Sequence, residues 1–172
     1  MMDLKTHIRE IPDFPKKGIL FYDITTLLSN KDAFREVILQ LAGPFRDKNI
    51  QKVIAIESRG FIFGTAVAHA LEAGFVPIRK PGKLPYKTIE ESYHLEYGQD
   101  RLAMHEDAVM PGERVLIIDD LLATGGTIAA AVNLTRRLGG EIVSVAFVIE
   151  LSFLKGRQRI PDVPIVSLLT YD

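Results

Sequence analysis

The sequence contains no cysteine. This absence excludes disulfides, thiolate metal sites and cysteine nucleophiles, and it fits the reducing conditions of the cytosol. The chain also lacks any apolar run near the roughly 18 residues that a membrane-spanning helix needs. Residues 1–11 carry charges throughout and lack the apolar segment of a signal peptide. We therefore expect a cytoplasmic protein without a membrane partner.

An excess of basic charge is missing as well. Lys and Arg together number 21, Asp and Glu together number 22, and the formal net charge is −1. Proteins that bind nucleic acid usually show a basic excess, because neutralising phosphates supplies most of the affinity. Basic residues gather only locally, between Arg79 and Lys87. We expect no nucleic-acid partner.

Two common phosphate-binding motifs are absent. The Walker pattern needs Gly-Lys-Ser/Thr, which the chain lacks, and no Gly-x-Gly-x-x-Gly follows an expected strand. The four histidines, at positions 7, 69, 94 and 105, do not show the spacing of a metal site. We therefore expect no metal ion held by protein side chains.

What the chain does contain is an alternation of short apolar runs and helical patterns. The apolar runs predict strands at 53–56, 75–78, 115–118, 142–149 and 165–169, and the helical patterns predict helices from about residue 31, at 61–73 and at 127–138. Such alternation favours an α/β fold with a mostly parallel central sheet and helices on both faces. Pro77 indicates that its strand lies at a sheet edge. The length of 172 residues fits one domain, 1–172, in which residues 1–30 form an irregular hood.

Periodicity lapses between residues 79 and 98. The stretch 80–87 is rich in proline, glycine and lysine. A loop of this length inside a compact domain is usually functional or disordered. We expect residues 80–98 to form a mobile flap.

The strongest chemical signal is the segment Val-Leu-Ile-Ile-Asp-Asp-Leu-Leu-Ala-Thr-Gly-Gly-Thr at 115–127. A buried strand brings Asp119 and Asp120 to the sheet edge where open α/β sheets bind ligands. Gly125 and Gly126 then allow backbone N–H groups to converge on an anion at the start of the next helix. Carboxylates beside a phosphate site can bind a sugar, because they accept strong hydrogen bonds from its hydroxyl groups. The segment therefore predicts a site for ribose 5-phosphate.

The same segment resembles the 5-phosphoribosyl 1-diphosphate signature of the type I phosphoribosyltransferases. Nearly the whole chain is similar to the adenine branch of that family, through the stretches 14–21, 57–61, 79–85, 92–98 and 150–157. The resemblance implies the type I phosphoribosyltransferase fold and transfer of the 5-phosphoribosyl group to adenine, which gives AMP and diphosphate. It also implies a homodimer and Mg²⁺ held mainly by the substrate diphosphate and ribose hydroxyls.

The resemblance assigns the site residues by matching positions. For the 5′-phosphate it implies Ala123, Thr124, Gly125, Gly126 and Thr127. For the diphosphate it implies Glu57, Ser58, Arg59, Arg79, Lys80 and Lys83, with a cis peptide between Glu57 and Ser58. For adenine it implies Leu20, Phe21 and Leu151, and for catalysis Glu96, Asp119 and Asp120, with Glu96 handling the purine proton.

Two alternatives stay open on the sequence. One is an enzyme for hypoxanthine, guanine or xanthine, because the polarity that distinguishes purines comes from backbone groups that a sequence does not display. The other is a non-catalytic regulator with the same fold. One position also departs from some relatives, which carry Arg where this chain has Tyr22.

Overall fold

A computed structural model describes residues 2–95 and 98–172. The chain divides into two compact units, Met1–Gln40 and Leu41–Asp172. The first unit begins with a 3₁₀ helix, Leu4–His7, and continues with the antiparallel strands β1 (Arg9–Pro12) and β2 (Leu20–Asp23). The helices α1 (Thr25–Ser29) and α2 (Lys31–Ala42) follow.

The first unit is more regular than its sequence suggests. Residues 1–30, expected to be irregular, contain the β1–β2 hairpin and two helical elements. The predicted start of α2 is confirmed, because the Asn30 side chain accepts hydrogen bonds from the backbone N–H groups of Asp32 at 3.1 Å and Ala33 at 3.0 Å. The extent of the hood and the single-domain organisation stay predictions.

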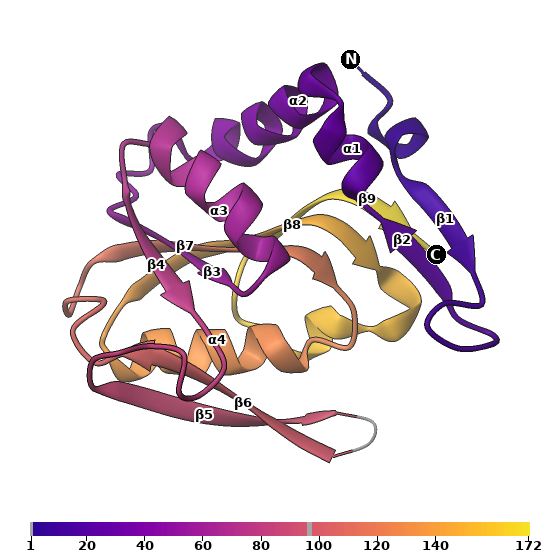
Figure 1. The fold of residues 1–172 in the computed structure, drawn as a ribbon. Coiled ribbons are helices and arrows are strands. Elements are labelled where there is room, and N and C mark those ends of the chain that lie inside the picture. The colour runs from indigo at the N-terminus through magenta and orange to yellow at the C-terminus, as the bar shows by residue number, and fades with distance from the viewer. Residues whose placement is uncertain (1, 96–97) are drawn as a thin grey trace. The chain divides into compact units, whose positions relative to one another are not determined.

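The second unit is built on a five-stranded parallel sheet (Figure 1). Its strands are β3 (Lys52–Ile56), β4 (Gly74–Ile78), β7 (Arg114–Leu122), β8 (Glu141–Leu151) and β9 (Ile165–Tyr171), in the order β4-β3-β7-β8-β9. Every neighbouring pair in this sheet is parallel. The predicted fold class is confirmed, and Pro77 lies on an edge strand as expected.

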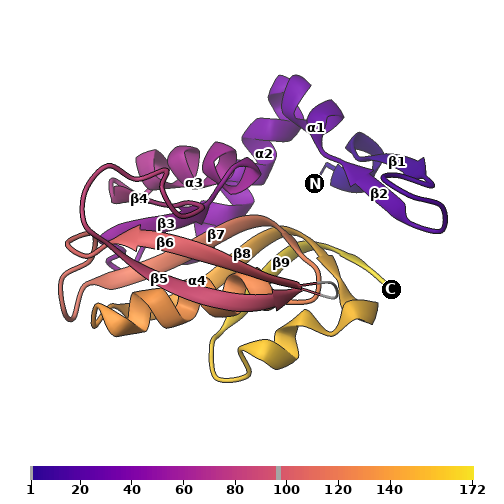
Figure 2. The ribbon, with the colours of Figure 1, turned by 60° about the horizontal axis from the view of Figure 1, so that its bottom comes forward.

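Helices cover the two faces of this sheet. Figures 1 and 2 show α3 (Arg59–Ala70) on one side and α4 (Gly126–Arg137) on the other. The prediction for α3 was wrong at its end, because the helix stops at Ala70 and the left-handed residue after it is Glu72 (φ 54°), ahead of Gly74. Gly139 (φ 83°) follows α4 as the sequence predicts. Short 3₁₀ helices occupy Gly43–Phe45, Ser152–Leu154 and Gly156–Arg159.

The segment expected to lack structure holds part of a β-hairpin. Strand β5 (Thr88–Leu95) pairs antiparallel with β6 (Gly98–His105), and residues 80–87 before it form neither helix nor strand. On one face of the hairpin Tyr93 and Leu102 are buried, while Glu90 and Arg101 form an exposed ion pair. Glu91 and Asp100 share the inner face with their register partners Leu102 and Tyr93, and these charged residues interrupt the apolar alternation that reveals a strand in a sequence. The mobility of this flap stays a prediction.

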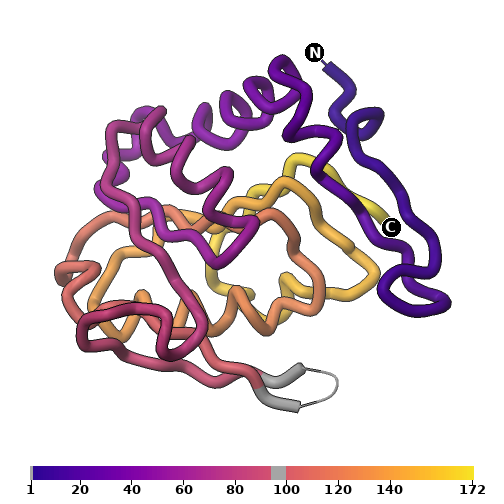
Figure 3. The backbone as a smooth tube through the Cα atoms, viewed as in Figure 1, coloured from indigo at the N-terminus to yellow at the C-terminus, as the bar shows by residue number. Residues whose placement is uncertain are grey.

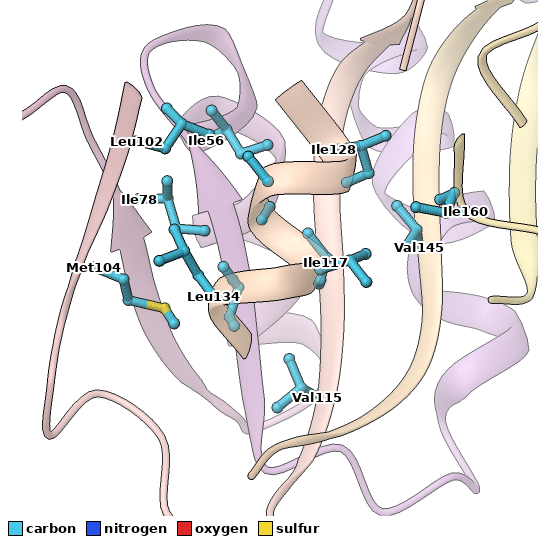
Figure 4. Packing of buried hydrophobic residues seen from close by; sticks show 14 of the residues in the cluster. Ile56, Ile78, Leu102, Met104, Val115, Ile117, Ile128, Leu134, Val145 and Ile160 are labelled. Atoms are coloured by element: carbon cyan, nitrogen blue, oxygen red, sulfur yellow. The ribbon is translucent and has the colours of Figure 1, made fainter. Parts of the chain in front are cut away.

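The hydrophobic core lies between α4, the sheet and the hairpin. Figure 4 shows Ile128 and Leu134 of α4 next to Ile117 of β7, with Leu102 of β6 on the far side. The four residues of β7 at 115–118 are fully buried, because both faces of that central strand are covered. Each such side chain contributes about 1.5–3 kcal/mol by leaving water. Across the described residues, the structure contains no helix long and apolar enough to span a membrane.

Candidate active site

Two turns meet at the carboxyl ends of the neighbouring parallel strands β3 and β7. Residues 57–59 link β3 to α3, and residues 123–125 link β7 to α4. A cavity of about 270 Å³ lies between them, and its charged lining comprises Glu57, Arg59, Lys80, Asp119 and Asp120. A second cavity, of about 70 Å³, is lined by the 123–125 turn, Thr127 and Asp119. Asp119, Ala123 and Thr127 line both, so the two cavities adjoin.

The paired acids stand inside β7 and not after it, because the strand continues to Leu122. Neighbouring side chains of a strand point to opposite faces, yet both acids line the larger cavity because it lies at the strand end. Asp120 is only 6% exposed, and its Oδ2 atom forms an ion pair with Arg59 Nε at 2.9 Å. The backbone N–H of Asp120 donates to Asp119 Oδ1 at 2.9 Å.

Asp119 occupies an environment that disfavours its charge. Burial raises the pKa of the Asp119 carboxyl well above its ordinary value of 3.8, and the neighbouring Asp120 charge raises it further. Part of the side chain remains accessible from both cavities. Asp119 is therefore placed to gain from a ligand that brings hydrogen-bond donors or positive charge.

The 57–59 turn is shaped by its backbone and by two ion pairs. The Glu57–Ser58 peptide is cis, as the sequence predicts. Arg59 pairs with Asp120, and Glu57 accepts a hydrogen bond from Arg79 Nη2 at 3.1 Å. Gly60 follows, and a Cβ there would lie 2.7 Å from Asp119 Oδ1, so only glycine allows α3 to begin this close to β7.

The basic residues after β4 divide into three environments. The Lys80 backbone N–H donates to Glu57, and its ammonium pairs with Asp100 and contacts the Tyr93 hydroxyl at 3.1 Å. Lys80 lines the larger cavity, whereas Arg79 reaches the turn through Glu57. Lys83 is exposed, and its carbonyl accepts a hydrogen bond from Arg79 Nη1 at 3.4 Å.

Tyr93 and Asp100 are site residues that sequence reasoning missed. They are directly opposite each other in the β5–β6 register, and the Tyr93 hydroxyl donates to Asp100 at 3.1 Å. Hydrogen bonds from Lys80 lower the pKa of the Asp100 carboxyl, although burial opposes the shift. Finding them required the hairpin register, which the sequence did not reveal.

The 123–127 loop has the geometry of a backbone anion site. Gly125 adopts a left-handed conformation (φ 83°) at the N-cap of α4, and its helix has no side-chain cap. The Ser58 N-cap of α3 likewise makes no side-chain capping bond. Both helix N-termini therefore keep backbone N–H groups available for an anion. Thr124 and Thr127 line the smaller cavity, and Gly126 begins α4.

The remaining expected residues lie elsewhere or outside the description. Leu151 ends β8 and is 8% exposed. Leu20 and Phe21 belong to β2 in the first unit, where Phe21 packs edge-on against Phe14 with ring centroids 5.1 Å apart. Glu96 lies outside the described residues. The roles assigned to all of these residues stay predictions.

Comparison with known proteins identifies the family. The model of the phosphoribosyl transferase domain matches residues 23–168. The chain belongs to the phosphoribosyltransferase family. This phosphoribosyltransferase is 58% identical to the adenine phosphoribosyltransferase of Acidobacterium capsulatum over 168 residues, which cover 98% of this chain and 93% of that protein.

Solved structures agree. The adenine phosphoribosyltransferase of Thermoanaerobacter pseudethanolicus has a TM-score of 0.95 and 50% identity, covering 98% of each chain. The enzyme of the same name from Saccharomyces cerevisiae, complexed with an imino-altritol bisphosphate and adenine, has a TM-score of 0.91 and 40% identity, covering 96% of each chain. The predicted family, its adenine branch and the predicted fold are confirmed.

Proposed function

We propose that this phosphoribosyltransferase moves the 5-phosphoribosyl group from 5-phosphoribosyl 1-diphosphate to adenine, giving AMP and diphosphate in purine salvage. The observation that carries this proposal is the pair of adjoining cavities with different chemistry. The smaller is lined by a backbone loop and hydroxyls, and the larger by Arg59, Lys80 and the two acids. One phosphate on a sugar and a diphosphate on its anomeric carbon fit such a pair.

The sugar phosphate is assigned to β7 and the loop after it. Residues 123–127 would hold the 5′-phosphate through backbone N–H groups, the Thr124 and Thr127 hydroxyls and the N-terminus of α4. Asp119 and Asp120 would accept hydrogen bonds from the ribose hydroxyls. Since the reaction passes through an oxocarbenium-like sugar, the same carboxylates would also stabilise the developing positive charge.

The diphosphate is assigned to the 57–59 turn and the basic residues after β4. Arg59 and Lys80 line the cavity directly, and Ser58 adds a hydroxyl beside the α3 N-terminus. Arg79 neutralises Glu57 and so keeps that carboxylate from repelling an anion. Lys83, on the exposed 80–87 loop, would approach only with a ligand bound. Preorganised positive charge of this kind stabilises a leaving group that gains charge in the transition state.

The base site is the less constrained part of the proposal. Leu20 and Phe21 of the hood would recognise adenine, with Phe21 stacking on the purine, and Leu151 would close the other side. Glu96 would act as general acid or base on the purine, and closure of residues 80–98 would exclude water from the activated sugar. These roles rest on the family resemblance and on the relative complexed with adenine.

The donor set fits Mg²⁺ brought by the substrate. In the described ranges, 2–95 and 98–172, no three His, Asp or Glu side chains form a group that could hold a metal ion. Mg²⁺ prefers oxygen ligands and usually binds through substrate phosphates with one or two carboxylates. Bound there, it would neutralise charge on the diphosphate. We further propose that the protein works as a cytoplasmic homodimer. The molar mass of the purified protein, measured by light scattering, tests the dimer.

A direct test compares three purines. With 5-phosphoribosyl 1-diphosphate and Mg²⁺, the purified protein should convert adenine to AMP, with kcat/KM for hypoxanthine and guanine lower by about 10²-fold or more. Turnover of hypoxanthine or guanine at the rate of adenine would reject the base assignment. If the protein bound 5-phosphoribosyl 1-diphosphate but turned over none of the three bases, the proposal that it is an enzyme would be rejected.

A further inference from the structure

A segment that contributes no residue to either cavity packs against the back of the 123–127 loop. It is the stretch 152–160 between β8 and β9, drawn in yellow in Figure 3, which contains the 3₁₀ helix Gly156–Arg159. A Cβ on Gly125 would lie 2.4 Å from the carbonyl oxygen of Gly156. A Cβ on Gly156 would lie 2.3 Å from the carbonyl oxygen of Ala123. The two backbones therefore meet at a distance that leaves no room for a side chain.

Gly156 is required for this contact and not for its own backbone angles. Its φ lies outside the left-handed region, whereas Gly125 has φ 83°. An alanine at 156 would thus be compatible with the local chain but would press on Ala123, whose carbonyl belongs to the backbone and cannot rotate away. The position of residues 123–125 consequently depends on the position of Gly156.

One ion pair fixes Gly156 to the sheet. Arg157 donates from Nε to Glu150 Oε1 at 2.5 Å and from Nη2 to Oε2 at 2.6 Å, a two-bond fork. The carboxylate sits on β8 and is only 5% exposed, and its backbone pairs in register with Leu122, the last residue of β7. The hydrogen bonds from Arg157 lower the pKa of the Glu150 carboxyl despite its burial.

These contacts form a closed circuit. It runs from Leu122 across the sheet to Glu150, through the fork to Arg157, back along the chain to Gly156 and onto the loop that follows Leu122. The 57–59 turn is held differently, by Asp120, Arg79 and Lys80. The circuit therefore acts mainly on the smaller cavity, because the loop reaches the larger cavity through Ala123 and Thr127 alone.

We propose that Arg157 and Glu150 are positioning residues for the 5′-phosphate, which hold the 123–127 loop in its binding geometry through Gly156. The inference rests on the proposed function of that loop. Neither side chain lines the cavities, so their effect on the ligand is transmitted by backbone contact. Selectivity between the two anions is the property that separates this role from a general contribution to folding.

The experiment measures ribose 5-phosphate and Mg²⁺–diphosphate separately by titration calorimetry. Arg157→Gln and Gly156→Ala should each weaken ribose 5-phosphate binding by about tenfold or more, since displacements near 1 Å cost that much at a preorganised site. Arg157→Lys keeps the charge but loses the fork, and its loss should be intermediate. Diphosphate affinity should fall by clearly less, because the 57–59 turn is held by its own ion pairs and the larger cavity meets the loop at Ala123 and Thr127 alone.

Matched controls come from the same unit. Arg114 also pairs with a strand carboxylate, Glu141, and donates to a carbonyl, Lys48, at 2.8 Å, but it lies at the opposite end of the sheet. Arg114→Lys should leave both affinities unchanged. Gly43 has no atom within 4 Å of its added Cβ, so Gly43→Ala controls for the glycine change.

Thermal melting by circular dichroism identifies variants that fail to fold. If Arg157→Gln does not fold, Arg157→Lys and Gly156→Ala provide the test. Equal losses for ribose 5-phosphate and diphosphate would reject positioning in favour of general stability. Wild-type affinity for ribose 5-phosphate in folded Gly156→Ala and Arg157→Lys would also overturn the inference. A wild-type protein that binds no ribose 5-phosphate would instead refute the proposed function of the loop.

Discussion

The two turns of the site have the same place in the fold but are held in opposite ways. Both follow a parallel strand and lead into a helix whose N-cap makes no side-chain bond. The 57–59 turn carries charged side chains and is held by the Arg59–Asp120 and Arg79–Glu57 pairs. The 123–127 loop carries no charge and is held by backbone packing on Gly156.

This difference indicates how each turn responds to change. A turn held by ion pairs is sensitive to the loss of one charge, because the remaining charge then lacks its partner. The carboxylates are the less solvated members, with the side chains of Asp120 and Glu57 only 9% and 16% exposed. A loop held by backbone contact tolerates changes of side chain but not an added Cβ at the contact. The predictions below test each half of this contrast.

The largest effect is expected at the charged turn. Asp120→Asn keeps the shape of the side chain but removes the charge that balances Arg59 at 2.9 Å. Turnover should fall by about 10²-fold or more, because preorganised charge around the reacting sugar is lost. Steady-state kinetics with adenine and 5-phosphoribosyl 1-diphosphate give the measurement.

Asp162→Asn is the matched control for Asp120→Asn. It weakens an ion pair of similar kind, with Arg136 at 2.6 Å, whose Asp side chain is 63% exposed. Exposed pairs contribute about 0–1 kcal/mol, so kcat should be unchanged. Wild-type turnover in Asp120→Asn would remove the charged turn from the mechanism.

A smaller effect is expected at the neutral loop. Gly125→Ala places a Cβ 2.4 Å from the Gly156 carbonyl oxygen and strains a residue with φ 83°. KM for 5-phosphoribosyl 1-diphosphate should rise by about tenfold or more, since the loop must shift. Gly112→Ala has the same strain (φ 83°) with nothing within 4 Å and lines neither cavity, so it separates strain from contact. Equal KM values in the two variants would show that packing on Gly156 does not matter.

The smallest effect concerns stability at Asp119, whose burial raises its carboxyl pKa. A raised pKa in the folded state means that this group favours folding below its ordinary value of 3.8 and that the benefit is lost as pH rises through the raised pKa. Asp119→Asn should therefore raise Tm at neutral pH, by about 2–4 °C per kcal/mol of relief. The gain should shrink as pH falls in melting experiments. A lower Tm at neutral pH would mean that the charge stabilises the fold.

Much of the sheet could be predicted from the sequence, because its central strands β3, β7 and β8 are buried on both faces and read as continuous apolar runs. The expected strand at 115–118 corresponds to β7, and that at 165–169 to β9. The β5–β6 hairpin could not be predicted in this way. Charged Glu91 and Asp100 lie on the same face as the buried Leu102 and Tyr93, and breakers at 80–87 mask where β5 begins.

The candidate site likewise contains a part that could be predicted from the sequence and a part that could not. The acids and the 123–127 loop follow a local motif, so a short window of sequence reveals them. The pairing of Arg59 with Asp120, the contact of Lys80 with Tyr93 and the approach of Gly156 to Ala123 join residues far apart in the chain. Their partners are set by strand order and register, which local patterns do not specify.

Gly60 determines the width of the site. Its missing side chain lets the start of α3 stand where a Cβ would come within 2.7 Å of Asp119 Oδ1 and 3.3 Å of the Ile118 carbonyl oxygen. The Ile118 carbonyl belongs to the backbone, so the Asp119 carboxylate is the group that can rotate to make room. Replacing this one hydrogen atom by a methyl group would therefore displace the carboxylate assigned above to the ribose hydroxyls, although residue 60 itself lines neither cavity.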